Sequence, residues 1–285
     1  MSWVLQALNG ISMGALLFLM ASGFTLSFGL ARVVNLAHGG FYLLGGYMGL
    51  SVLRATHSFS LALVVGGASV VVVGLLSERF LIRFTLHNEL AQVLLTVGIA
   101  YVLADICLHV WGGDPQRIPP PAFAQGPIDL PGGLVYPRYR FLLIVFGLVV
   151  GAVLWLLYSR TLLGAIVRAG VDDREMVSAI GINIDRLFAL VFALAAFLAG
   201  LSGVAGGAFL TLYPGAEWDI LVLALVVVIV GGLGSLEGAM VGSLVVGLVD
   251  AYGRWLLPEF SYFIVFGPMA LLLLFRPTGF FGREA

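Results

Sequence analysis

Residues 141–158 read FLLIVFGLVVGAVLWLLY and contain no charged side chain. As a helix rising about 1.5 Å per residue, such a run crosses most of a hydrocarbon core that is about 30 Å thick. Similar runs recur along the 285-residue chain, and only 10% of its residues are charged, against roughly 25% in an average soluble domain. The sequence therefore predicts an all-α, polytopic helical bundle in a membrane.

Reading the apolar runs between polar breaks gives nine candidate spans. They cover residues 4–29, 36–53, 60–82, 90–111, 141–158, 187–210, 219–233, 238–256 and 261–275. The second span and the seventh or eighth are rich in glycine, which in a membrane marks close helix packing or a helix broken at mid-depth. We expect a single transmembrane domain over residues 1–285, with eight or nine spans, one of them broken or re-entrant.

The arginines set the expected orientation. By the positive-inside rule, arginine-rich connections face the cytoplasm, which puts the N-terminus outside and the C-terminus inside. Nine arginines are then cytoplasmic, Arg32, Arg79, Arg83, Arg160, Arg168, Arg174, Arg186, Arg276 and Arg283, and five external, Arg54, Arg117, Arg138, Arg140 and Arg254. Residues 112–140 form the periplasmic loop, which holds seven of the 11 prolines and is either a docking or gating element or an extended cover. Residues 159–186 form a cytoplasmic loop.

Two glycine-rich segments lie inside predicted spans. Residues 33–49 place Asn35 and His38 beside Gly39 and Gly40. A helix that starts late or breaks here frees helix ends that can hold a charged small molecule, so this segment is a candidate for a substrate path. The alternative is that the glycines serve close packing and that both polar side chains bond neighbouring carbonyls. In residues 231–247, small residues four positions apart favour packing.

Residues 168–186, RAGVDDREMVSAIGINIDR, hold seven of the chain's 29 formal charges. Asp172 is the expected N-cap of a short cytoplasmic helix, with Glu175 three positions on as in a capping box and Gly181 as its stop. Its apolar face consists of Met176, Val177 and Ile180. A small apolar face framed by charges favours insertion into a groove of a partner protein over lying on lipid, with a plain connecting loop as the alternative.

The residue inventory excludes several classes. All 14 basic residues are arginine, and a P-loop needs a lysine on the nucleotide phosphates, so this chain alone is no P-loop ATPase. No nucleophile, triad or metal-ligand motif is present, the single cysteine Cys107 has no partner, and the chain is not basic enough for nucleic acid. We expect no catalytic residue, metal or cofactor in this chain.

Asp105 and Asp250 are the acids expected within the bilayer, with Glu89 near a membrane face. An intramembrane acid is a candidate for binding a proton or a cationic substrate, although one near a span end can also reach water. These acids support a second class of function, a proton-coupled secondary transporter or channel that works alone. A purely structural membrane subunit is disfavoured by the polar segment 33–49.

Several segments resemble one known family. They are ARVVNLAHGGFYLLGGY (31–47), YSRTLLGAIVRAGVDDREMVSAIGINIDRLFAL (158–190), LAGLSGVAGG (198–207), GGLGSLEGAMVGSLVVG (231–247) and FRPTGFFG (275–282). Together they look like the shorter, H-type permease of the high-affinity branched-chain amino acid ABC importers. The resemblance implies a branched-chain amino acid substrate or a related small polar solute such as urea, an amide or a carboxylate.

The resemblance also implies partners and residue roles. It implies a bacterial inner-membrane heterodimer with a second related permease, two cytoplasmic ATPase subunits that bind ATP and Mg, and a periplasmic substrate-binding protein. The charged segment is then the coupling helix that rests on an ATPase during ATP-driven alternating access. Its expected contact residues are Arg168, Asp172, Asp173, Arg174, Glu175, Met176 and Ile180, and the expected path residues are Asn35, His38, Gly39 and Gly40.

Overall fold

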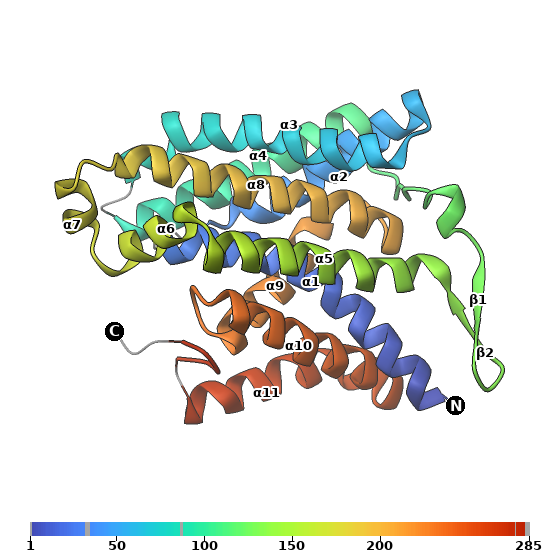
Figure 1. Cartoon of the computed structure of the whole chain (residues 1–285). Coiled ribbons are helices and arrows are strands. Elements are labelled where there is room, and N and C mark those ends of the chain that lie inside the picture. The colour runs from blue at the N-terminus through green and yellow to red at the C-terminus, as the bar shows by residue number, and fades with distance from the viewer. Residues whose placement is uncertain (1, 32–34, 86–87, 277, 283–285) are drawn as a thin grey trace.

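A computed structural model describes residues 2–31, 35–85, 88–276 and 278–282 and is almost entirely helical (Figure 1). Within these residues, nine helices of 15 to 30 residues form the bundle. Their bounds are α1 Ser2–Ala31, α2 Ala37–Thr56, α3 Phe59–Phe80, α4 Glu89–Trp111, α5 Arg138–Arg160, α8 Ile184–Phe209, α9 Ala216–Gly231, α10 Leu236–Leu256 and α11 Ser261–Phe275. Each of the nine predicted spans falls on one of these helices.

Six helices are long and apolar enough to cross a membrane, namely α1, α3, α4, α5, α8 and α10. The predicted all-α helical membrane protein is therefore confirmed at the level of fold class. The remaining three, α2, α9 and α11, are not among the six, and α9 and α11 have only 16 and 15 residues. The count of eight or nine spans stays a prediction.

The smaller elements lie at the two ends of the bundle (Figure 1). A hairpin of β1 Pro127–Leu130 and β2 Leu134–Pro137 stands at the same end as the N-terminus, while α6 Leu162–Asp172 and α7 Arg174–Ala179 stand at the opposite end, with the C-terminus. Three short 3₁₀ turns complete the list, η1 Ile82–Thr85, η2 Ala122–Ala124 and η3 Pro258–Phe260. The hairpin and α6 were not predicted, since each lies inside a segment read as a loop.

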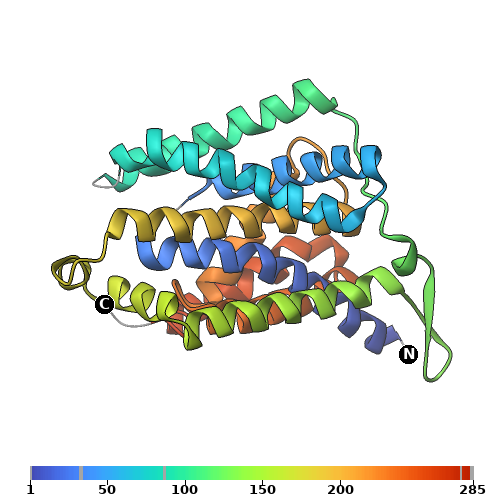
Figure 2. The same cartoon turned by 45° about the horizontal axis from the view of Figure 1, so that its top comes forward.

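Helices α1 and α8 form the centre of the bundle (Figure 2). In their most apolar windows 78% of α1 and 72% of α8 is buried, against 22% to 28% in α3, α4 and α5. The outer helices turn long apolar side chains outward, as a lipid-facing surface requires. Helix α2 runs without a break through both of its glycine pairs, so the second predicted span is not interrupted between residues 37 and 56.

Glycines let the central helices approach backbone to backbone. A Cβ built on Gly200 of α8 would lie 2.7 Å from the carbonyl oxygen of Gly66 and 3.0 Å from the Cα of Gly67, both on α3. A Cβ on Gly14 of α1 would lie 2.8 Å from the carbonyl oxygen of Ser243 on α10. Such van der Waals contacts favour helix association within lipid, where the hydrophobic effect contributes no free energy of association.

The C-terminal residues cap the end of α9. The amides of Phe280 and Phe281 donate to the carbonyl oxygens of Val230 and Gly231, each at 2.9 Å. The last carbonyls of a helix have no partner within the helix. Phe280 and Phe281 therefore pair with the last turn of α9, next to the α9–α10 turn.

We predict that Gly200→Ala lowers the free energy of unfolding by about 1–3 kcal/mol, the usual cost of overpacking. The added methyl group has no space between α8 and α3, so the two helices must separate. Thermal unfolding of the purified protein in detergent measures the change. The matched control is Gly98→Ala on α4, where a Cβ meets nothing within 4 Å; equal melting of both variants and the unchanged protein would contradict the packing described.

Candidate functional site

A cavity of about 910 Å³ lies between α1, α9, α10 and α11, closed by the start of α5 and the end of α8. This volume is within the usual range of small-molecule sites, roughly 300–1,000 Å³. The lining includes Asn9, Arg140, Phe209, Asp219, Asp250 and Phe266. Most of these residues belong to the helix ends nearest the hairpin, so the cavity occupies that half of the bundle.

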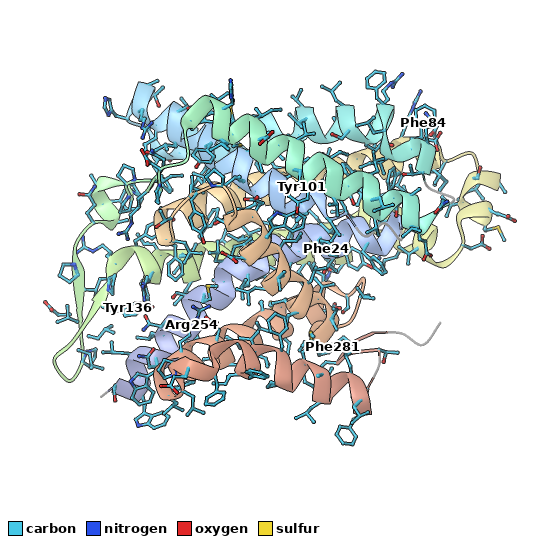
Figure 3. All side chains as sticks on the ribbon, turned by 180° about the vertical axis from the view of Figure 1, so that it is seen from behind. Phe24, Phe84, Tyr101, Tyr136, Arg254 and Phe281 are labelled. Carbon is cyan, nitrogen blue, oxygen red and sulfur yellow. The ribbon has the colours of Figure 1, made fainter. Side chains whose placement is uncertain are left out.

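An ion pair closes one side of the cavity. Arg254 donates from Nε to Oδ1 of Asp250 at 2.8 Å, one helical turn away on α10. The Asp250 side chain is only 7% exposed, whereas that of Arg254 is 63% exposed. Figure 3 marks Arg254, on the part of α10 that packs along α1. Asp250, one of the two acids singled out in the sequence, is therefore neutralised by a neighbouring arginine.

A second arginine, Arg140, stands in the first turn of α5. Its Nη1 donates to Oδ1 of Asn9 at 2.5 Å, and its guanidinium carbon lies 5.0 Å from the centroid of the Phe209 ring. Beside it, Tyr136 of β2 (Figure 3) donates its phenolic hydrogen to Oγ of Ser12 at 3.2 Å. Burial raises the pKa of Tyr136, while the hydrogen bond with Ser12 and the charge of Arg140 oppose that rise.

Two acids stand at the start of α9. Gly215, with φ of 115°, turns the chain into this helix, and its amide donates to Oε2 of the buried Glu217 at 2.7 Å. Asp219 lines the cavity, and its Oδ2 accepts a hydrogen bond from the hydroxyl of Tyr213 at 2.7 Å. Negative side chains at this position are favoured, because the N-terminal end of a helix carries a partial positive charge.

Asn35 and His38, predicted for the substrate path, are both buried at the start of α2. Oδ1 of Asn35 accepts from the amide of Ala37 at 3.1 Å. Nε2 of His38 lies 3.1 Å from the carbonyl oxygen of Met20 on α1, and its ring meets Phe24 edge-on at 5.9 Å. The contact of His38 is the one that the packing alternative describes, whereas Asn35 accepts from a backbone amide and does not bond a carbonyl.

Gly39 and Gly40 likewise sit at close helix contacts. A Cβ on Gly39 would lie 2.6 Å from the carbonyl oxygen of Glu217, and a Cβ on Gly40 would lie 3.1 Å from the Cα of Ala100. His38, Gly39 and Gly40 thus hold α2 against α1, α9 and α4, whereas the bond of Asn35 is local. The cavity lining includes none of the four predicted path residues. Their part in the path stays a prediction.

Helix α7 confirms the predicted short helix but corrects its cap. The N-cap is Asp173, whose Oδ1 accepts from the amide of Met176 at 2.9 Å, whereas Asp172 is the last residue of α6. The extended backbone at Asp173, with φ of −150°, aims its carboxylate at that amide. Gly181 follows α7 with φ of 88°, as expected of a helix stop.

The apolar residues of α7 divide between two environments. Met176 and Ile180 are 62% and 68% exposed, whereas Val177 is only 3% exposed. The expectation that all three share one outward face is therefore wrong, since Val177 points into the protein. Asp173 and Glu175 are exposed; the side chains of Asp172 and Arg174 lie outside the described residues.

Arg168, another predicted contact residue, is engaged within the chain. Its guanidinium donates to the backbone carbonyl of Tyr158 and lies 5.2 Å from the centroid of the Tyr158 ring. It therefore ties α6 to the end of α5. Arg83 forms a comparable link at this end of the bundle, an ion pair with Asp185 at 2.7 Å.

Sequence reasoning missed Arg140, Asp219 and Asn9 as site residues. Arg140 was counted in the external loop, and Asp219 was the unremarked first residue of a predicted span. One signal for them exists, namely that all three are polar residues near span ends on the same predicted side of the membrane. Within the described residues, no group of three or more His, Cys, Asp or Glu side chains is placed to hold a metal ion.

The fold and the cavity define a multi-pass membrane protein with a ligand-sized site between its helices. Residues 6–273 match the family model described as branched-chain amino acid transport system / permease component. The chain belongs to this family and is a non-catalytic membrane subunit.

The chain is similar to several curated proteins. It is 30% identical to the high-affinity branched-chain amino acid transport system permease protein BraD of Pseudomonas aeruginosa, over 98% of this chain and 95% of that protein. It is 26% identical to the permease protein LivH of Escherichia coli K12 over the same shares of the two chains. A probable LivH of Methanocaldococcus jannaschii is also 26% identical, over 92% of this chain and 85% of that one. No solved structure is significantly similar to the chain.

We predict that Arg168→Ala loosens α6. Losing a charge-assisted bond to a carbonyl lowers the free energy of local opening, so hydrogen exchange of the α6 amides should accelerate by roughly tenfold. Exchange mass spectrometry on peptides that cover residues 162–172 measures this. Arg160→Ala is the control, because Arg160 stacks on Trp155, at 5.8 Å, within its own helix; equal exchange in both variants would refute the link through Arg168.

Proposed function

We propose that this chain is the transmembrane permease subunit of a binding-protein-dependent ABC importer for branched-chain amino acids or a related small polar solute. The observation that carries the proposal is the family match over residues 6–273. The curated relatives support it, since BraD and LivH are named as branched-chain amino acid permeases. The transport step is ATP-driven alternating access around the cavity.

The proton-coupled alternative is not favoured. Asp250, one of the two acids on which it relied, forms an ion pair with Arg254 at 2.8 Å. The carboxylate of Asp250 is thus engaged by a guanidinium and is not an isolated intramembrane acid. The other acid, Asp105, faces outward from α4.

In the proposed setting the permease lies in the bacterial inner membrane with the N-terminus and hairpin outside. The C-terminus and α7 then face the cytoplasm, where two ATPase subunits bind ATP and Mg. A periplasmic binding protein delivers substrate at the hairpin end, where the cavity lies. The arginine distribution supports this orientation, because nine of 14 arginines fall on the cytoplasmic side.

Exposed residues on the outer face of α4 support the proposal that a second permease packs against this helix. Asp105 is exposed there, and a Cβ on Gly98 would meet nothing within 4 Å. A charged side chain in a spanning helix normally faces protein or a water-filled cavity rather than lipid. On the same face Tyr101 (Figure 3) lies 5.2 Å, between ring centroids, from Trp218, which lines the cavity. A second permease on this face would cover Asp105 beside the path.

Helix α7 is the proposed contact with an ATPase. It carries two exposed apolar side chains, Met176 and Ile180, at the end of the bundle opposite the hairpin. Val177 packs into the protein, and the hydrogen bond that the N-cap Asp173 accepts from the amide of Met176 fixes the first turn of the helix. Large apolar side chains on a short, anchored helix suit a groove in a partner protein.

We predict that Met176→Asp and Ile180→Asp each weaken the stimulation of ATPase activity by the loaded binding protein by roughly tenfold, the effect of about 1.4 kcal/mol. A carboxylate in an apolar groove costs free energy because it loses its water. ATP hydrolysis by the reconstituted complex is the measurement. Ser178→Asp is the control, since Ser178 is exposed and polar on the same helix; stimulation unchanged in the first two variants would rule out α7 as the coupling helix.

We also predict that the two ends of the helix bundle are accessible to a labelling reagent from opposite sides of the membrane. In a Cys107→Ser background, Asp129→Cys in the hairpin should react with a membrane-impermeant maleimide in intact cells, whereas Ser178→Cys in α7 should react only after permeabilisation. Cys107 itself is buried, so its removal lowers background labelling only. The reverse pattern would overturn the orientation.

A further inference from the structure

We propose that the cavity is a binding site for the zwitterionic head group of an apolar amino acid, with Arg140 as the partner of the carboxylate and Asp219 as the partner of the ammonium group. The assignment rests on the proposed function and names the residues that would recognise its substrate.

The first argument is the balance of charge. Among the described residues two ion pairs are formed, Arg83 with Asp185 and Arg254 with Asp250. Arg140 and Asp219 take part in neither, yet both line the same cavity. Arg140 is half-buried and Asp219 is exposed, so both charges are open to the space of the cavity. A cation and an anion that line one cavity without pairing with each other point to a ligand that carries both signs.

Arg140 is oriented without being neutralised. Nδ2 of Asn9 donates to Oε1 of Gln6 at 3.2 Å, which leaves Oδ1 of Asn9 to accept from Arg140. The face of Phe209 supports the guanidinium from the other side. Both supporting groups are uncharged, so the arginine keeps its charge and its planar donor fork, which matches a carboxylate.

Asp219 is held in a similar way. One of its oxygens accepts from the hydroxyl of Tyr213, and the partial positive charge at the start of α9 is complementary to a carboxylate. It reaches the cavity from α9, whereas Arg140 reaches it from α5. The two charges therefore come from separate helices, and no ion pair among the described residues joins them across the cavity.

The rest of the lining suits an aliphatic side chain. It includes Met13 of α1, Ile220 and Leu223 of α9, and Val265 and Phe266 of α11. A simple anion would be repelled by Asp219 and a simple cation by Arg140. An amino acid with an apolar side chain meets no unfavourable charge and buries its hydrocarbon part.

The test uses the complete importer complex without its binding protein and three probes: leucine, leucinamide, which lacks the carboxylate, and 4-methylpentanoate, which lacks the ammonium group. We expect Arg140→Gln and Asp219→Asn each to weaken leucine binding by roughly ten- to a hundredfold, the range for bonds to charged groups. Arg140→Gln should leave leucinamide binding unchanged, Asp219→Asn should leave 4-methylpentanoate binding unchanged, and Arg140→Lys should restore part of the leucine affinity.

Matched controls are Arg138→Gln and Asp129→Asn, whose side chains lie outside the cavity lining. Three outcomes would overturn the assignment. They are an unchanged leucine affinity in both cavity variants, equal losses of affinity for all three probes, and no leucine binding by the unchanged complex. ATP-driven leucine uptake by the unchanged complex with its binding protein separately tests the proposed function. If the unchanged complex takes up leucine but the cavity variants leave leucine affinity unaffected, the proposed site is refuted and the proposed function is not. If the unchanged complex takes up no leucine, the proposed function is refuted.

Discussion

The structure depends on the close approach of helix backbones at glycine. Lipid gives apolar side chains no gain on burial against each other, so association depends on van der Waals contact over short distances. Helices α2, α3 and α8 meet where each presents a glycine, and a Cβ on Gly200 would stand 2.7 Å from the carbonyl oxygen of Gly66. The 38 glycines of the chain thus supply much of the specificity that a soluble core draws from interlocking side chains.

The same constraint positions the cavity. Gly39 lets α2 rest on the backbone of Glu217, at the start of α9. The amide of Gly215 is bound by the Glu217 carboxylate, and Asp219 follows half a turn later. A side chain at Gly39 would displace the start of α9 and Asp219 with it. Gly39, one of the two glycines that the sequence suggested for a path, therefore packs one layer behind the cavity, against the helix that bears its acid.

Hydropathy predicted the helices well because a bilayer requires of a spanning helix a minimum length and an apolar composition. It missed the hairpin and α6, which lie outside the runs that this rule governs. The cap of α7 shifted from Asp172 to Asp173 because capping depends on backbone angles, and either aspartate satisfies the sequence pattern. Arg140 and Asp219 were missed for a different reason, since only the arrangement of the helices brings the starts of α5 and α9 to one cavity.

The connectivity also links the two ends of the molecule. The α6–α7 segment is flanked by α5 and α8, and the far ends of these two helices carry Arg140 and Phe209, which contact each other across 5.0 Å in the cavity wall. Helix α8 is central and meets α3 at glycine contacts, whereas α5 is less buried, packs against α1 at Gly147 and is tied to α6 by Arg168. A force on α7 therefore acts on one central helix and one outer helix. Displacing α5 relative to α8 would move Arg140 off the face of Phe209, so the side chain proposed to bind the carboxylate is also the one most directly exposed to motion of the proposed coupling segment.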